Sequence, residues 1–294
     1  MRNFKSFSMK KVVFVLLACL LVFSACSKFN KIRKEKDHLK KYEAAIDYYE
    51  KKHYDKALIL LEEIEPLLRG KKEGEKAQFL TAQCYYKTKQ YELASYSFKR
   101  FYETYPRSEW AEECLYMHAY SLYNQSPESE LDQKPTLEAI QSIQTYLNTY
   151  PQSKRIEEAN NIIKELRSKL ELKAYQNAMV FYKNSNYKAA IQTFSNFEKD
   201  YPDSDFMEEV MFKKLETLYN LARQSIVSKQ VARLNETLSF YEEYKYKFPE
   251  SKYLKDASAI AEAARKQIAE LKKLDNPDNT ENQTQTITDK QNEK

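Results

Sequence analysis

The sequence predicts an all-α protein built from repeated pairs of helices. The chain holds only two glycines, Gly70 and Gly74. Sheets with tight hairpins depend on glycine or Asn-Gly at their turns, and no sustained alternation of period two is present. The same small and aromatic residues also recur at fixed offsets along the chain. Such self-similarity is the sequence signature of stacked structural repeats.

Each repeat places a small residue and an aromatic one turn later on a first helix. After a short turn, a second helix carries alanine and apolar residues at three- and four-residue spacing, which puts them on one face. Three sets share these offsets: Ala45, Tyr48, Tyr54, Ala57, Leu61 and Ile64; Ala82, Tyr85, Tyr91, Ala94, Phe98 and Phe101; Ala178, Phe181, Tyr187, Ala190, Phe194 and Phe197. The small residues let two helices approach closely, and the aromatic rings fill the space beside them.

A second phrase marks the junctions between repeats. Proline disfavours helical geometry at the residue before it, so a helix must end there. The serine two residues later is a suitable N-cap for the next helix, and acidic residues follow where the helix dipole favours them. The four copies are Tyr105-Pro106-Arg107-Ser108, Tyr150-Pro151-Gln152-Ser153, Tyr201-Pro202-Asp203-Ser204 and Phe248-Pro249-Glu250-Ser251.

This pattern resembles the tetratricopeptide repeat, whose helix–turn–helix units stack into a superhelical solenoid. The resemblance implies about five units within residues 39–273, of which two are longer than the usual repeat of about 34 residues. The units are expected near residues 39–73, 75–106, 109–151, 172–202 and 204–249. Residues 153–183 are predicted to form one long helix, a loop near 125–134 lengthens the third unit, and a last helix near 253–273 caps the stack.

The N-terminal segment predicts export. Basic residues precede an apolar run from Val12 to Phe23, which is too short to span a membrane and fits a signal peptide over residues 1–25. Ser24-Ala25-Cys26 resembles the lipobox of bacterial lipoproteins, which implies a covalent lipid on Cys26 and no other cofactor. An ordinary signal peptide with a coincidental cysteine is the alternative, and Cys19 is a weaker lipidation candidate because Leu20 to Phe23 would remain on the chain.

The mature chain is nearly neutral. Four of the 48 basic side chains lie in the segment removed, which leaves 44 against 43 acidic ones. This balance gives no reason to expect a nucleic-acid partner. Residues 26–38 are expected to be a tether, and residues 274–294 a disordered tail because they lack aromatic residues. Cys84 and Cys114 lack metal-like spacing; free buried thiols and a disulfide both remain open.

No catalytic or metal-binding constellation is visible. His38, His53 and His118 fall in different units without a ligand-like partner at helical spacing. The carboxylates lie on charge-mixed helix faces, which is the usual solvated pattern. The sequence therefore predicts a protein that is not an enzyme.

The stronger functional signal is a row of aromatic pairs on the first helices. Each pair lies three residues before and four after the small residue, so both rings share a face. The pairs are Tyr42 and Tyr49, Phe79 and Tyr86, Tyr116 and Tyr123, and Tyr175 and Tyr182. First helices line the concave surface in the repeat family, so the resemblance implies a groove for extended peptides. The alternative is that some rings pack against the neighbouring unit, as we expect for Trp110.

A lipidated cysteine, five such units and repeated junctions together resemble the BamD family of outer-membrane lipoproteins over most of residues 26–273. The resemblance implies a non-enzymatic scaffold of the β-barrel assembly machinery, anchored in the outer membrane and facing the periplasm. The residues after Cys26, Ser27-Lys28-Phe29, lack an acidic stretch, which favours that orientation. By the same resemblance, the first units bind unfolded barrel precursors, and residues 204–273 contact the barrel-inserting pore protein BamA.

Two alternatives share the repeats and differ in their partners. One is another periplasmic repeat lipoprotein that acts as an adaptor in cell-envelope synthesis or division. The other is a surface lipoprotein that captures nutrients.

Overall fold

The computed structural model describes residues 28–274, and these form helices and connecting turns without a strand. The predicted signal peptide over residues 1–25, Cys26 and the tail from residue 275 lie outside the described residues. The chain divides between Leu166 and Arg167 into two compact units. The predicted all-α class is confirmed.

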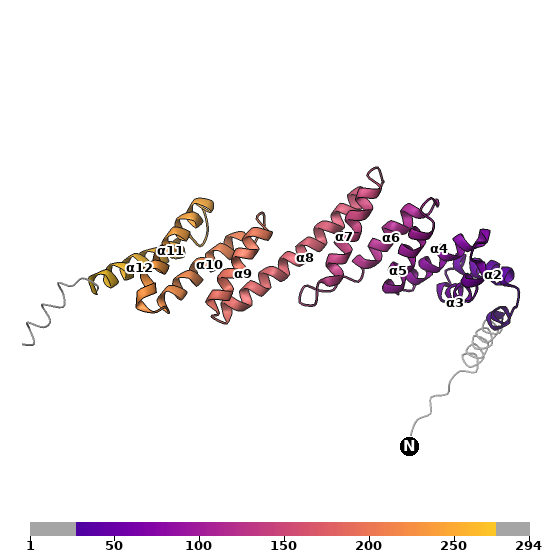
Figure 1. Ribbon diagram of the computed structural model, residues 1–294, viewed down its shortest axis with the longest axis horizontal. Coiled ribbons are helices and arrows are strands. Elements are labelled where there is room, and N and C mark those ends of the chain that lie inside the picture. The colour runs from indigo at the N-terminus through magenta and orange to yellow at the C-terminus, as the bar shows by residue number, and fades with distance from the viewer. Residues whose placement is uncertain (1–27, 275–294) are drawn as a thin grey trace, which may run out of the picture. The chain divides into compact units, whose positions relative to one another are not determined.

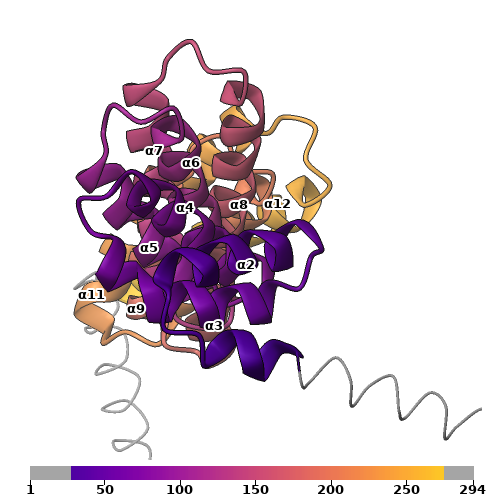
Figure 2. The same ribbon diagram turned by 90° about the vertical axis from the view of Figure 1, so that its right-hand side faces the viewer.

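The first unit consists of three successive helix pairs and the start of a fourth first helix (Figures 1 and 2). Its elements are α2 (His38–Glu50), α3 (Tyr54–Ile64), the 3₁₀ helix η1 (Glu65–Leu68), α4 (Lys72–Lys87), α5 (Tyr91–Thr104), α6 (Ala111–Tyr123), α7 (Lys134–Thr149) and the beginning of α8 (Ile156–Lys183). From α2 to α7 each helix packs against the next along the chain, as stacked helical hairpins require, and the start of α8 shares a buried cluster with α6 and α7.

The second unit continues from α8. It contains α9 (Tyr187–Asp200), α10 (Met207–Arg223), α11 (Val227–Lys247) and α12 (Leu254–Leu274). The first half of α8 buries Ala159 and Leu166 in the first unit, and its second half buries Ala178 in the second. The predicted long helix within residues 153–183 is therefore confirmed, as is the capping helix near 253–273.

The repeated small residues form the closest helix contacts. The alanines of all three matching sets are completely buried: Ala45, Ala57, Ala82, Ala94, Ala178 and Ala190. Phe98, Phe101, Phe194 and Phe197 fill the space beside them and are also buried. Cys84 and Cys114 are buried free thiols within this packing.

The serine of each proline junction begins the next helix as the sequence predicts. The Oγ atom of Ser108 accepts a hydrogen bond from the backbone N–H of Trp110 at 3.1 Å, and that of Ser204 accepts from Phe206 at 3.0 Å. Ser153 and Ser251 do the same with the residue two positions later. These bonds satisfy N–H groups at the start of a helix that have no partner within the helix.

Two junction serines join larger networks. The Tyr244 hydroxyl and the Glu208 carboxylate both bond to the Oγ atom of Ser251, the latter at 2.6 Å. Tyr146 likewise bonds to Ser153 and donates to Glu112 at 3.2 Å. In the two longer repeats, the serine thus ties the end of the second helix to the beginning of the first.

The junction between the first two pairs lacks the proline phrase, and both glycines of the chain serve it. Gly70 has φ +73°, a left-handed conformation that glycine adopts without strain. At Gly74 on α4, a β-carbon would lie 2.3 Å from the backbone oxygen of Leu68, which ends η1. The absence of a side chain therefore lets α4 pass directly beside η1.

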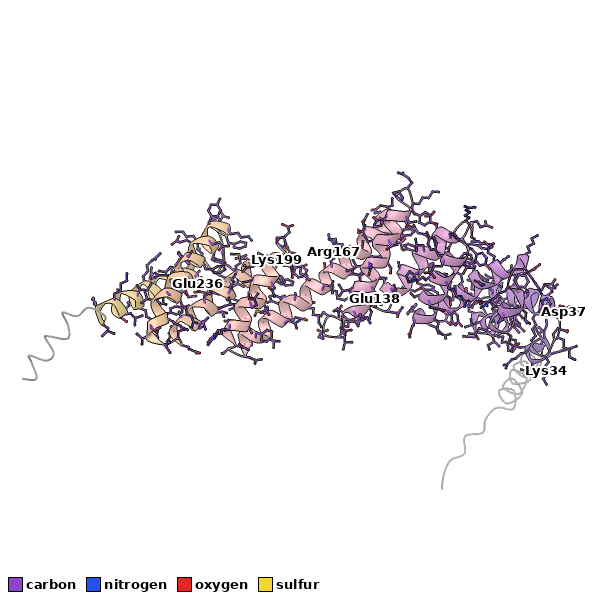
Figure 3. All side chains as sticks on the ribbon, in the orientation of Figure 1. Lys34, Asp37, Glu138, Arg167, Lys199 and Glu236 are labelled. Carbon is purple, nitrogen blue, oxygen red and sulfur yellow. The ribbon has the colours of Figure 1, made fainter. Side chains whose placement is uncertain are left out.

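The segment predicted as a tether is partly structured. Residues 28–33 are helical, and the Phe29 ring packs edge-on against Tyr48 with 5.6 Å between centroids. Arg33 forms an ion pair with Glu63 at 2.8 Å. The α2 helix then begins after Asp37, labelled in Figure 3, whose side chain accepts from the Leu39 N–H at 2.9 Å. At the other end, α12 includes Leu274, one residue into the predicted tail.

The two glycines predict different tolerance to substitution. We expect Gly74→Ala to lower the free energy of unfolding by about 3 kcal/mol, because the added methyl meets backbone that cannot move aside. Gly70→Ala should cost about 1 kcal/mol, and Gly70→Asn less, because asparagine tolerates the left-handed conformation. Urea denaturation followed by circular dichroism measures all three, and equal midpoints for Gly70→Ala and Gly74→Ala would contradict this account.

Substitutions of the junction serines in the second unit should lower the free energy of unfolding by different amounts. Ser204→Ala should cost about 1 kcal/mol of unfolding free energy, the usual value of a helix N-cap. Ser251→Ala should cost about 2 kcal/mol, because Tyr244 and Glu208 also lose their shared partner. Ser168→Ala on the exposed surface of α8 is the matched control and should be neutral. The same denaturation experiment measures the loss of unfolding free energy in all three variants. Equal losses for Ser204→Ala and Ser251→Ala would show that the bonds of Tyr244 and Glu208 to Ser251 add no stability.

Candidate functional site

The eight predicted groove rings fall into two classes according to their place on the first helix. In three of the four predicted pairs, the earlier ring is covered by the residue two positions after a junction serine. Trp110 stacks on Phe79 at 5.1 Å between centroids and 13° between planes, and Phe206 stacks on Tyr175 at 4.4 Å and 16°. Phe79 and Tyr175 are therefore used for packing between successive helix pairs. This was the alternative interpretation of the sequence.

Tyr116 shows the same arrangement with a cation. The Arg155 guanidinium lies over its ring at 4.6 Å, and Tyr146 packs edge-on at 5.2 Å. The Tyr116 side chain is only 5% exposed. Its burial removes it from a peptide-binding surface and corrects the expectation drawn from its spacing.

The first unit begins with a pair that no proline junction precedes. Tyr42 remains half-buried against the first apolar cluster, and no ring stacks over it among the described residues. Burial, with a smaller contribution from the charge of Glu73, raises the pKa of its hydroxyl. Tyr42 therefore differs from the other three earlier rings and stays a candidate.

The later ring of each pair has a different environment. In the first unit these are Tyr49, Tyr86 and Tyr123, all half-buried on α2, α4 and α6. Tyr49 packs edge-on against Tyr54 at 5.4 Å, and Tyr86 lies 6.1 Å from Tyr120. Each ring is thus held by a neighbour while part of it remains accessible.

The structure adds Tyr120, which the sequence analysis passed over. Its ring lies 5.5 Å from Tyr123 and 5.6 Å from Tyr116, so it connects the buried aromatic core with the accessible rings. The signal was present in the sequence, because residues 116, 120 and 123 follow four- and three-residue spacing. We call the half-buried rings Tyr49, Tyr86, Tyr120 and Tyr123 the tyrosine face.

Carboxylates border the tyrosine face on successive first helices. The Tyr123 hydroxyl donates to Glu165 on α8 at 2.8 Å, and the Gln83 amide on α4 donates to Glu113 on α6 at 3.0 Å. Burial and then the bond to Glu165 raise the pKa of Tyr123 to about 12, and burial chiefly does the same for Tyr49. Near neutral pH both hydroxyls therefore stay protonated, and that of Tyr123 remains a donor to Glu165.

The second unit repeats this contact with one more charge. The Tyr182 hydroxyl on α8 donates to Glu216 on α10 at 2.9 Å, and Lys213 lies over its ring at 5.2 Å. Lys213 also pairs with Glu216 at 2.8 Å. Tyr182 is therefore the ring most restrained by its own neighbours, and it offers less free surface than the tyrosine face of the first unit.

His118 has a packing environment. Its Nδ1 atom lies 2.9 Å from Ser95 Oγ, and the residue lines a recess of about 460 Å³ between α5, α6 and α7. Burial lowers the pKa of its imidazole, so the ring is neutral near neutral pH. Its side chain ties α6 to α5.

Within residues 28–274, no helix combines the length and the apolar character needed to cross a bilayer.

The family comparison agrees with the resemblance to the BamD family seen in the sequence. The model of the YfiO family, described as outer membrane lipoprotein, matches residues 34–234. The putative outer membrane protein assembly factor BamD of Aquifex aeolicus (strain VF5) is 29% identical over 260 residues, covering 85% of this chain and 81% of its own. A solved structure, the TPR2AB-domain:pHSP90-complex of yeast Sti1, covers 78% of this chain and 98% of its own at 12% identity and a TM-score of 0.36. The chain is a non-enzymatic scaffold and belongs to the YfiO (BamD-like) family of outer membrane lipoproteins.

Proposed function

We propose that this protein is a scaffold of the outer-membrane β-barrel assembly machinery whose first unit binds unfolded barrel precursors. The observation that carries the proposal is the tyrosine face on α2, α4 and α6. Tyrosine combines apolar area with a hydrogen-bonding tip, and it is enriched at protein-binding sites. The relationship to an assembly factor of Aquifex aeolicus supports the same role.

The chemistry of this face suits an extended chain. Half-buried rings accept aromatic and apolar side chains at low entropic cost, because they have few rotatable bonds and are already held by neighbours. Glu113 and Glu165 lie beside them as acceptors for backbone N–H groups or for basic side chains. A barrel strand before insertion presents both alternating apolar side chains and unpaired backbone groups.

The remaining parts of the proposal concern the second unit and the anchor. Residues 204–273 would contact the periplasmic part of the pore protein BamA, and a lipid on Cys26 would hold the chain in the outer membrane facing the periplasm. Tyr246 on α11 supports a contact in this region, because its side chain is 90% exposed. Exposed large aromatic side chains are typical anchors of protein interfaces.

Truncation of the tyrosine face should weaken peptide binding. We expect the double substitution Tyr49→Ala and Tyr86→Ala to reduce the affinity for a synthetic barrel-strand peptide about tenfold or more, since central aromatic anchors dominate binding energy. Fluorescence anisotropy measures the affinity, and a thermal melt follows the fold. Tyr96→Ala on α5 is the matched control, because Tyr96 is 63% exposed and lies outside the face.

Equal affinities for the control and the double variant would contradict the proposed binding face. Where truncation lowers the melting temperature strongly, Tyr123→Phe supplies a milder variant that removes only the hydroxyl bonded to Glu165. Unchanged peptide affinity in both variants would assign these rings to packing alone.

The second-unit contact predicts a specific crosslink. A photoreactive amino acid at Tyr246 should capture the pore protein in intact envelopes, whereas the same group at Tyr96 should not. Mass spectrometry of the crosslinked species identifies the partner. Capture dominated by cell-wall or division proteins, without the pore protein, would favour the envelope-adaptor alternative over the assembly role.

A further inference from the structure

The turn between α10 and α11 carries an exposed apolar tip. Ile226 and Val227 are each 66% exposed, although both are β-branched hydrocarbons that usually lie in cores. Ser225 and Ser228 flank them. In Figure 1 this turn lies at the same edge of the second unit as the turn from α8 to α9.

The equivalent turns of other pairs are built differently. The turns after α2, α4 and α8 read Lys51-Lys52-His53, Thr88-Lys89-Gln90 and Asn184-Ser185-Asn186, and all are polar. Each uses a residue with φ between 55° and 61°: Lys52, Lys89 and Ser185. At the α10–α11 turn, Ile226 is instead extended, with φ −59° and ψ 146°. In this helix pair, the polar turn found in the other three is therefore replaced by a turn that presents apolar side chains.

Hydrogen bonds hold this tip in place. The Gln230 amide donates to the backbone oxygen of Ser225 at 2.8 Å, and the Arg233 guanidinium donates to the Ser225 hydroxyl. The backbone N–H of Lys229 donates to the oxygen of Ile226 at 2.9 Å. Below the turn, Ala222 and Leu234 are buried together. The two apolar side chains are thus presented by an ordered scaffold, and their exposure is a stable property of the fold.

The charges around the tip have one sign. Between Glu216 and Glu236 the chain carries Arg223, Lys229 and Arg233 and no acidic residue; Glu236 is labelled on α11 in Figure 3. Neither Arg223 nor Lys229 forms an ion pair with another residue of the described part of the chain.

The neighbouring helix does not reverse this balance. The last turns of α12 pack against the same region through Ile268 and Leu271. They carry Glu270 as their one acid after Glu262, together with Lys266, Lys272 and Lys273 and with Arg265, which pairs with Glu242 on α11. An apolar tip therefore stands within a cationic collar.

We propose that the α10–α11 turn is a membrane-contact site that inserts Ile226 and Val227 into the headgroup boundary of an anionic phospholipid surface. Short apolar segments flanked by lysine and arginine bind such surfaces by combining apolar burial with attraction to anionic lipid. A bilayer is also the partner that the shape favours. Specific protein interfaces bury about 800 Å² per partner, whereas a two-residue protruding tip fits a deformable surface. This membrane contact does not depend on a protein partner bound to the helical repeats.

Vesicle binding tests this proposal with residues 27–294, which contain every described residue but not the predicted lipid anchor. Co-sedimentation with vesicles containing phosphatidylglycerol should exceed that with phosphatidylcholine alone, and added salt should weaken it. The double substitution Ile226→Asp and Val227→Asp should reduce the affinity at least tenfold. Val180→Asp on α8, where Val180 is 53% exposed, is the matched control and should bind as the parent does.

Charge reversal separates the collar from general electrostatics. Arg223→Glu with Lys229→Glu should abolish the preference for anionic vesicles, whereas Lys199→Glu with Lys245→Glu, at exposed positions near the C-terminal ends of α9 and α11, should leave most of it (Figure 3 labels Lys199). Equal losses in the two double variants would overturn the assignment to this turn.

A fluorescent label reports insertion directly. Val227→Cys can be labelled with an environment-sensitive nitrobenzoxadiazole group, because Cys84 and Cys114 are buried. Its emission should rise and shift to shorter wavelength with anionic vesicles, and a label at Val180→Cys should not change. No binding of the parent chain to either vesicle, or no response of the label at residue 227, would overturn the proposal. Loss of pore-protein capture in the aspartate variant with unchanged vesicle binding would assign the turn to a protein interface instead.

Discussion

The residue that follows each junction serine by two positions constrains the rest of the structure. Proline ends one helix, serine starts the next, and this residue then packs over a ring on the preceding first helix. Tyr253 on Phe212 is the closest to parallel, with 7° between planes and 4.6 Å between centroids. Because the stack fixes both the separation and the rotation of successive hairpins, each unit has a defined position relative to the next within its own compact part. The stability of stacked repeats is approximately the sum of the stability of each repeat and of such nearest-neighbour contacts.

This constraint also divides the aromatic residues into structural and accessible ones. A first-helix ring under the stack, such as Phe79 or Tyr175, cannot meet a ligand. The ring seven residues later lies two turns further along the same face, beyond the reach of the stacking residue. Tyr86 and Tyr123 therefore remain accessible, although Phe79 and Tyr116, the earlier rings of the same pairs, are covered. One end of each first helix therefore packs against the next helix pair, and the other end stays accessible to a ligand. This division explains why aromatic residues recur in pairs.

Much of this arrangement could be predicted from the sequence, because proline, serine and the buried alanines act through local geometry. The helix pairs, the long α8 helix and the extended α6–α7 loop follow from the spacing of these residues. The division of the aromatic pairs could not be predicted, since Trp110, Arg155 and Phe206 differ in type and share only a position after serine. The role of Gly70 and Gly74 was also hidden, because a close approach to Leu68 depends on the path of η1. Helical packing of Phe29 on Tyr48 was missed because a short segment near a charged stretch shows no clear periodicity.

The residue pattern shared by the helix pairs stabilises the fold. A position that departs from this pattern therefore indicates a function. Polar turns with a left-handed residue connect three of the other helix pairs, and polar residues at exposed turns carry no solvation cost. Ile226 and Val227 replace such a turn with apolar surface, and the fold gains no core contact from their exposure. Real proteins break local rules mainly where function requires it. A scaffold that belongs to a family of outer membrane lipoproteins has a bilayer within reach, and a cationic collar around an apolar tip is the surface that such a bilayer would select.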